Sequence, residues 1–236
     1  MKQNPGRCWA VLPAAGIGAR MGGELPKQYL QVAGATVLEH SMHALLACER
    51  LAAVVVALHP DDDRAGELPV FTDPRVQRIC GGAERSDSVR AGLAALAARA
   101  EPDDWVLVHD AARPCLQAQD IARLIDQVTA SGTGGILAEA IVDTVKQAGP
   151  DALILRTLDR STLWRAQTPQ MFRLGELQAA LERAGQQGLP VTDEASAMEL
   201  AGYPVQLVPG PARNLKVTRP ADLRLAAWYL SGQADS

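Results

Sequence analysis

Short apolar runs alternate with amphipathic stretches along most of the chain. The runs are rich in Val, Ile and Leu and lack a strict alternation with polar residues, which is typical of strands buried on both faces of a mostly parallel sheet. Six runs are strand candidates: Trp9–Leu12, Ala53–Leu58, Val76–Cys80, Trp105–His109, Gly135–Ala138 and Val205–Val208. The pattern therefore predicts a sheet whose strands are separated along the sequence by other elements.

The stretches between these runs carry apolar residues at helical spacing. The first begins with the capping box Thr36-Val37-Leu38-Glu39, and its apolar face continues through Met42 and Leu45. The other helix candidates are Ser88–Ala100, Asp120–Ala130, Gly175–Ala184, Asp193–Leu200 and Ala221–Leu230. Strand–helix alternation with short connections favours a Rossmann-like, doubly wound α/β fold. Since no repeat, low-complexity tract or Pro/Ser-rich linker interrupts it, we predict a single domain over residues 1–236.

One segment departs from this alternation. Ile141–Lys146 and Ala152–Leu158 are both strand-like, and Gln147-Ala148-Gly149-Pro150-Asp151 between them is a strong turn signal. We expect a β-hairpin inserted between two elements of the sheet. A lone two-stranded hairpin is only marginally stable in water, so we expect this arm, residues 141–160, to rest on another subunit.

Charge and cysteine content exclude several classes of function. The formal net charge of −4 argues against a surface for nucleic acid or for an anionic membrane. The longest apolar run, Leu51–Leu58, is far too short to span a membrane. The four cysteines are scattered without a Cys-x-x-Cys pair, so we expect neither a zinc site nor a disulfide framework. A reducing cytoplasm is the expected compartment.

The segment Leu12–Leu30, LPAAGIGARMGGELPKQYL, carries the first candidate chemistry. A loop with Gly16 and Gly18 has little side-chain bulk, so its backbone N–H groups can close around an anion. Two cations, Arg20 and Lys27, follow it and suit a polyphosphate better than a single carboxylate. The dinucleotide fingerprint and the P-loop do not fit, because they require other residues at positions 21 and 24.

Polar residues also follow other strand candidates, at the edge of an open α/β sheet where ligands usually lie. The third strand leads into Gly81–Arg85, the fourth leads into His109–Arg113, and Lys216 comes in near the C-terminus. In phosphoryl and nucleotidyl transfer, cations neutralise the transferring phosphate and a carboxylate holds Mg²⁺. Arg20, Lys27 and Lys216 with one acid at a strand end form such a set.

In order and spacing, the motifs resemble those of the 2-C-methyl-D-erythritol 4-phosphate cytidylyltransferase family. They are AAGIGARM with PKQYL, GGAERSDSV, VLVHDAARP, TLDRSTLW, QTPQ, TDEASAMEL and NLKVTRPADL, and they run from about Trp9 to Tyr229. The resemblance implies a Rossmann-like fold of the nucleotidyltransferase type. It also implies transfer of CMP from CTP to methylerythritol phosphate, with release of pyrophosphate, in the non-mevalonate route to isoprenoids.

The resemblance further implies a role for individual residues. The nucleotide would be bound by Ala14, Ala15, Gly16, Gly18, Gly82 and Ser88. Mg²⁺, or another divalent cation, would be held by Asp110. The catalytic cations would be Arg20, Lys27, Arg160 and Lys216. The acceptor, methylerythritol phosphate, would be bound by Arg113, Thr144, Arg160, Thr168, Thr192 and Lys216.

The resemblance also implies a homodimer with exchanged arms, because Thr144 and Arg160 lie on the hairpin and would reach a neighbouring subunit's site. The attacking phosphate is already an anion at neutral pH, so no general base is needed. His109 is therefore expected to be a structural neighbour of Asp110. One position departs from the family pattern. Ala83 stands after the Gly-Gly pair, where members often carry an acid, and base selectivity is the property this change would affect.

Two other functions stay open. On the same fold, the chain could transfer CMP to another polyol phosphate such as ribitol 5-phosphate. From a different class, it could be a nucleotide-binding regulatory module that has lost catalysis. Intact Arg20, Lys27, Asp110 and Lys216 argue against that module, because a decayed enzyme would be expected to lose at least one of them.

Overall fold

A seven-stranded sheet forms the centre of the computed structural model, which describes residues 6–16 and 25–232. Its order is β11-β7-β10-β6-β1-β4-β5. The strands are β1 (Cys8–Pro13), β4 (Leu51–Leu58), β5 (Val76–Cys80), β6 (Trp105–Val108), β7 (Gly135–Ala140), β10 (Trp164–Arg173) and β11 (Gln206–Pro209). Among these described strands, β10 runs antiparallel between β6 and β7, and the others are parallel to one another. The predicted mostly parallel sheet is confirmed.

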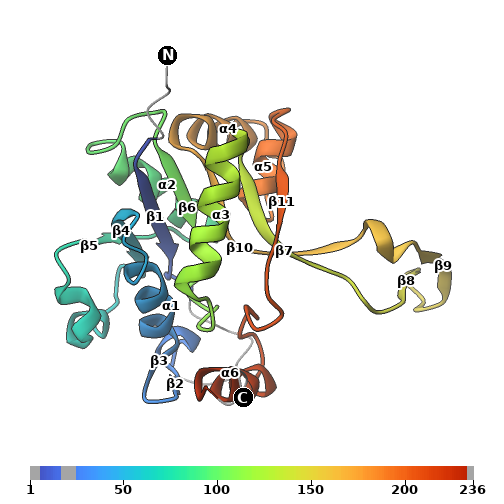
Figure 1. Cartoon of the computed structure of the whole chain (residues 1–236), viewed down its shortest axis with the longest axis horizontal. Coiled ribbons are helices and arrows are strands. Elements are labelled where there is room, and N and C mark those ends of the chain that lie inside the picture. The colour runs from blue at the N-terminus through green and yellow to red at the C-terminus, as the bar shows by residue number, and fades with distance from the viewer. Residues whose placement is uncertain (1–5, 17–24, 233–236) are drawn as a thin grey trace.

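Helices cover both faces of the sheet (Figure 1). They are α1 (Val37–Leu46), α2 (Arg85–Leu96), α3 (Ala118–Ser131), α4 (Leu174–Gln186) and α5 (Glu194–Leu200), while α6 (Pro220–Leu230) packs apart from these faces, against Cys115 and Val217. Short 3-10 helices are η2 (Lys27–Tyr29), η3 (Ala65–Glu67), η4 (Pro69–Thr72) and η5 (Arg160–Thr162), and a short strand pair joins β2 (Gln31–Val32) to β3 (Ala35–Thr36). Within the described ranges, no helix has the length and apolar content needed to cross a membrane.

Two apolar cores lie on the two faces of the sheet. Alternate residues of β1 point to opposite faces, so Ala10 and Leu12 belong to the core with α1 and α3. Trp9 and Val11 belong to the other core, with α2, α4 and α5. Because both faces are buried, β1 is apolar throughout, and the doubly wound α/β fold is confirmed.

Strand β10 was not predicted. Its buried half contains Gln167, Thr168, Pro169 and Gln170, and a strand pattern with polar residues and a proline is normally read as a loop or an edge. In the structure these polar side chains are buried because distant groups satisfy them. Gln170 Oε1, for example, accepts from Ala195 N at 2.8 Å.

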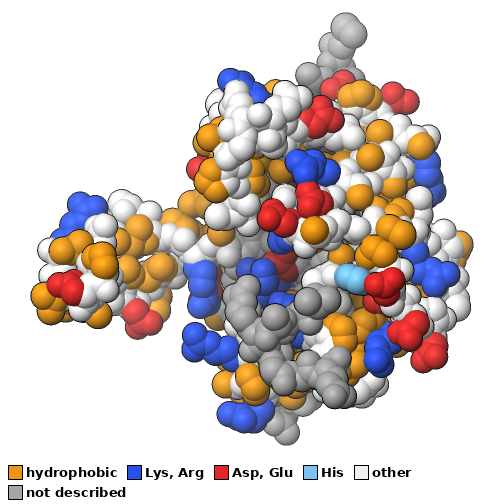
Figure 2. Space-filling view, turned by 180° about the vertical axis from the view of Figure 1, so that it is seen from behind, with side chains coloured by type: hydrophobic (Ala, Val, Ile, Leu, Met, Phe, Trp, Pro, Cys, Tyr) orange, Lys and Arg blue, Asp and Glu red, His pale blue; other side chains and the backbone are white. Residues whose placement is uncertain are grey.

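The inserted hairpin is confirmed, with β8 (Val145–Ala148) paired antiparallel to β9 (Ile154–Leu158). It lies between β7 and β10 and projects from the side of the body as an arm (Figure 1). Four of its large apolar side chains, Val142, Leu153, Ile154 and Leu155, are exposed, and Val142 is 77% accessible. Figure 2 shows hydrophobic side chains over much of the arm's surface. The arm, residues 141–160, therefore presents apolar surface that its own body does not cover.

Candidate active site

A pocket of about 350 Å³ opens at the carboxyl ends of β1, β5 and β6. β1 lies between β4 and β6, so the strand order reverses at β1 and the connections on its two sides run in opposite directions. Open α/β sheets bind ligands at such a point. The pocket is lined by the loop after β1, by η2 with Lys27, by the start of α2 and by the turn after β6. Lys216 and Thr218, from the segment before α6, also line it. The structure thus brings together residues that are far apart in the sequence.

Most of the residues predicted to bind the nucleotide line this pocket. They are Ala14, Ala15, Gly16, Gly82 and Ser88. The other two residues predicted near the triphosphate, Gly18 and Arg20, lie outside the described residues. The predicted catalytic Lys27 also lines the pocket.

Close backbone approach explains the glycines after β5. A Cβ on Gly81 would lie 2.6 Å from Ala15 Cβ and 2.7 Å from Ser88 Oγ, so a side chain there would push the two walls of the pocket apart. Gly82 N donates to Ser88 Oγ at 3.1 Å, and the Ser88 hydroxyl donates to Glu84 O at 3.3 Å. The two residues predicted to contact the base, Gly82 and Ser88, are therefore held against each other at the start of α2.

Asp110 is the first charged residue after β6 and lies at the centre of a cluster of cations. Its Oδ1 accepts from Arg85 Nε at 2.8 Å, while Lys216 Nζ lies 2.8 Å and Arg113 Nε 3.7 Å from Oδ2. Burial raises the pKa of the Asp110 carboxyl, but the charges of Arg85, Lys216 and Arg113 outweigh burial and hold the pKa below its ordinary value. Asp110 is therefore a carboxylate at neutral pH.

The Arg85–Glu194 pair was missed by the sequence analysis. Arg85 Nη1 and Nη2 donate to the two carboxylate oxygens of Glu194 at 2.7 and 2.9 Å, while Nε of the same guanidinium binds Asp110. Burial lowers the pKa of Arg85, but the Glu194 and Asp110 charges raise it above its ordinary value overall. Both residues lie in the quoted motifs, yet nothing in the sequence indicates that they pair.

Glu194→Ala is expected to lower the free energy of unfolding by about 3–5 kcal/mol, because Glu194 is 1% exposed and its loss leaves part of the Arg85 charge buried without a partner. Urea unfolding followed by circular dichroism measures this. Glu199→Ala, an exposed position on the same helix, is the matched control and is expected to change stability by no more than about 0.5 kcal/mol. Equal unfolding midpoints for the two variants would contradict the structural importance of the pair.

Three of the residues predicted to bind the acceptor surround Asp110, namely Arg113, Thr168 and Lys216. Among the described residues, Lys216 lines the pocket, whereas Arg113 and Thr168 lie behind its wall. Thr168 Oγ1 accepts from Asp110 N at 3.0 Å. Arg113 Nη1 donates to Asn214 O at 2.7 Å, and Asn214 Nδ2 donates to Thr168 O at 2.7 Å. The buried Asn214 thus fixes the segment that carries Lys216.

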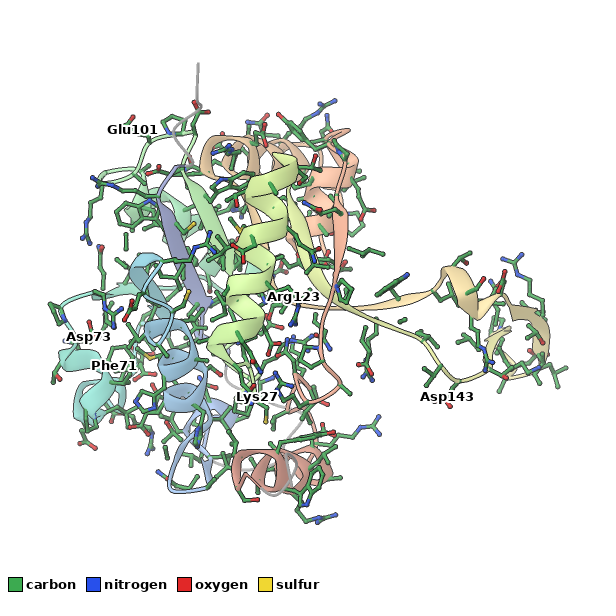
Figure 3. All side chains as sticks on the ribbon, in the orientation of Figure 1. Lys27, Phe71, Asp73, Glu101, Arg123 and Asp143 are labelled. Atoms are coloured by element: carbon green, nitrogen blue, oxygen red, sulfur yellow. The ribbon has the colours of Figure 1, made fainter. Side chains whose placement is uncertain are left out.

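The remaining predicted acceptor residues lie elsewhere. Thr192 is exposed, and its N–H donates to Ser196 Oγ at 3.1 Å at the start of α5, two residues before Glu194. Thr144 and Arg160 are on the arm, and neither is among the described residues that line the pocket. Figure 3 shows Asp143, the neighbour of Thr144, out on the arm, and Lys27 in the body.

His109 is fully buried and holds this side of the site in place. Its Nε2 lies 3.3 Å from Arg113 O, which can only accept, so Nε2 carries the proton and Nδ1 accepts from the Thr168 hydroxyl at 3.0 Å. Burial lowers the pKa of His109 to about 4. The ring is therefore neutral at pH 7 and, as expected, a structural neighbour of Asp110.

The chain is similar to known proteins of one family. The family model for 2-C-methyl-D-erythritol 4-phosphate cytidylyltransferase (IspD) matches residues 8–232. A protein of that name from Serratia proteamaculans is 53% identical over 94% of this chain and 93% of its own length. One from Vibrio parahaemolyticus is 50% identical over 98% of both. The crystal structure of the Francisella tularensis protein of that name is 35% identical over 94% of this chain and 99% of its own, with a TM-score of 0.81. The chain therefore belongs to the 2-C-methyl-D-erythritol 4-phosphate cytidylyltransferase family.

Proposed function

We infer that this chain transfers CMP from CTP to 2-C-methyl-D-erythritol 4-phosphate and releases pyrophosphate, a step of non-mevalonate isoprenoid synthesis. One observation carries the site assignment. Asp110 and two of its cations, Arg85 and Lys216, line the same pocket as the loop after β1 and the start of α2. Membership of the family supplies the two substrates.

The mechanism we propose is an in-line displacement. An oxygen of the acceptor phosphate forms a bond to the α-phosphorus of CTP, while the bond from that phosphorus to the bridging oxygen breaks and pyrophosphate leaves with the electron pair. The acceptor phosphate is already an anion at pH 7, so no proton has to be removed. Lys27 and Arg20 would neutralise the charge at the α-phosphorus, and catalysis rests on positioning and charge.

The charge of the cluster suits this chemistry. Arg85, Arg113 and Lys216 face the carboxylates of Asp110 and Glu194, so this group has an excess of one positive charge before Lys27 is added. Lys216, which lines the pocket, and Arg113 beside Asp110 would hold the acceptor phosphate. Thr168 donates its hydroxyl proton to His109 Nδ1, so toward the acceptor its oxygen would take part only as a hydrogen-bond acceptor. CTP would then lie between Gly82 and the loop after β1.

The residues present fit a divalent cation. Mg²⁺ in nucleotide sites is usually bound by one or two carboxylates together with phosphate oxygens and water, and Asp110 offers a charged carboxylate in the pocket. When bound, Mg²⁺ would supply positive charge that offsets the negative charge of the triphosphate. Arg85 and Lys216, which contact the two carboxylate oxygens of Asp110, would fix the orientation of this carboxylate in the pocket.

Asp110→Asn is expected to raise the Mg²⁺ concentration needed for half-maximal activity by about 10-fold or more, with partial rescue at high Mg²⁺, because the neutral amide is a weaker ligand. Pyrophosphate release measured against Mg²⁺ concentration tests this. Asp126→Asn, an exposed residue on α3, is the control. A Mg²⁺ dependence of the Asp110 variant equal to that of the control would contradict the assignment.

We also propose that two copies form a homodimer by exchanging arms. The exposed apolar residues Val142, Leu153 and Ile154 provide the surface that a second copy would cover. Thr144 and Arg160 would then reach the acceptor phosphate in the partner's site.

We place the enzyme in the cytoplasm, since its cysteines are free thiols and one of them, Cys80, is exposed.

The function is tested by incubating the wild-type protein with CTP, methylerythritol phosphate and Mg²⁺ and measuring pyrophosphate. We expect release only when the nucleotide, the acceptor and the metal are all present. Binding of CTP without turnover on any acceptor would instead favour the regulatory nucleotide-binding module.

A further inference from the structure

The side chain of Gln28 connects the two segments that would surround the triphosphate. Gln28 belongs to η2, next to Lys27, and is 4% exposed. Its Nε2 donates to Ala14 O at 2.9 Å and to Gly16 O at 3.0 Å. Both N–H groups of one amide are thereby used on the loop after β1.

These two hydrogen bonds orient the peptide groups of the loop. In a trans peptide the N–H points away from the carbonyl of the same peptide unit, so Ala15 N–H points away from the Ala14 oxygen that Gln28 holds. Among residues 6–16 and 25–232, no oxygen accepts the Ala15 N–H. With Ala14 N bound to Ala57 O at 2.8 Å, both backbone polar groups of Ala14 are held in place.

The segment that carries Lys27 is held on its other side as well. The Tyr29 hydroxyl donates to Asp62 Oδ2 at 2.5 Å, and Tyr29 N donates to Pro26 O at 2.9 Å. Asp62 Oδ1 accepts from Ala65 N at 2.9 Å, which ties the contact to η3. The two residues that follow Lys27, Gln28 and Tyr29, are therefore both held by hydrogen bonds of their side chains.

We propose that Gln28 is a positioning residue of the transfer reaction. It sets the distance between the Lys27 amine and the loop of residues 14–16, so that both contact the triphosphate at once. The inference rests on the proposed function, because it assigns the triphosphate to this loop. Gln28 makes no bond to the reacting atoms and acts through Lys27 and through the loop backbone.

The test replaces the amide without adding charge. Gln28→Met keeps an unbranched side chain of similar length but donates no hydrogen bond, and Gln28→Asn keeps the amide but is too short to reach both carbonyls. We expect each to weaken CTP binding, measured by isothermal titration calorimetry without acceptor, by about 10- to 100-fold. The KM for methylerythritol phosphate should change by no more than about twofold, since the acceptor side is intact. Gln186→Met, at an exposed position on α4, is the matched control and should match wild type.

A merely structural role gives a different result. If Gln28 served folding alone, its variants would lose thermal stability, and the remaining folded enzyme would bind CTP as wild type does. Wild-type CTP affinity in folded Gln28→Asn would thus overturn the inference even if Gln28→Met failed to fold. The proposed function would stand, because it is judged from turnover by the wild-type protein.

A double-mutant cycle tests the route through Lys27. We expect Gln28→Met to lower kcat by about 10-fold in the wild-type background and by no more than about twofold in the Lys27→Ala background. The second effect is small because the Lys27 amine, which Gln28 positions, is absent from that background. An equal loss of kcat in both backgrounds would contradict positioning through Lys27.

Discussion

Lys27→Ala is expected to lower kcat for pyrophosphate release by about 100-fold or more. Lys27 lines the pocket beside the loop after β1, where its ammonium would neutralise charge that develops at the α-phosphorus. Because the interaction strengthens in the transition state, the loss should fall more on kcat than on the KM for CTP.

Steady-state kinetics with both substrates varied measures this loss. Arg183→Ala, which removes an exposed cation at the end of α4, is the control and should behave as wild type. Near-wild-type activity of Lys27→Ala would show that the phosphates lie elsewhere.

The second large effect concerns the arm. Arg160→Ala is expected to be nearly inactive alone, as is Lys27→Ala, but a mixture of the two should recover activity. In a mixed dimer with exchanged arms, one site combines the intact body of the Arg160→Ala chain with the intact arm of the Lys27→Ala chain, and the other site carries both lesions. With random re-association of equal amounts, about half the dimers are mixed and activity should return to about a quarter of wild type.

This mixing experiment has opposite outcomes for the two arrangements of the arm. If Arg160 acts within its own subunit, every site keeps one lesion and mixing restores nothing. A gel-filtration mass of one chain, or no recovery after verified subunit exchange, would contradict arm exchange and leave the chemistry of the pocket unchanged.

Much of the fold could be predicted because its local signals agree with the final structure. The Thr36–Glu39 capping box forms as expected, with Thr36 N donating to Glu39 Oε2 at 2.8 Å. The apolar runs became buried strands, and the rule that ligands lie at strand ends placed Asp110 and Gly82 at one pocket.

The parts that could not be predicted depend on partners far apart in the sequence. Strand β10 was missed because Gln167 is polar, and its burial depends on distant partners. Asn214 Nδ2 donates to Gln167 Oε1 at 3.2 Å, and Gln167 Nε2 donates to Pro211 O at 2.9 Å. Arg85 and Glu194 likewise have no local signal, since 109 residues separate them. Gln28 could be seen in the PKQYL motif, but its two carbonyl acceptors are set by the path of the loop, which the sequence does not reveal.

The central claim is that this site joins CMP from CTP to methylerythritol phosphate rather than to another polyol phosphate. It is tested most directly by comparing kcat/KM for methylerythritol phosphate and ribitol 5-phosphate, with CTP and Mg²⁺ in both assays. We predict a preference for methylerythritol phosphate of at least about 10-fold, because groups that bind one acceptor are left without partners by another. Equal or higher kcat/KM with ribitol 5-phosphate would contradict the account.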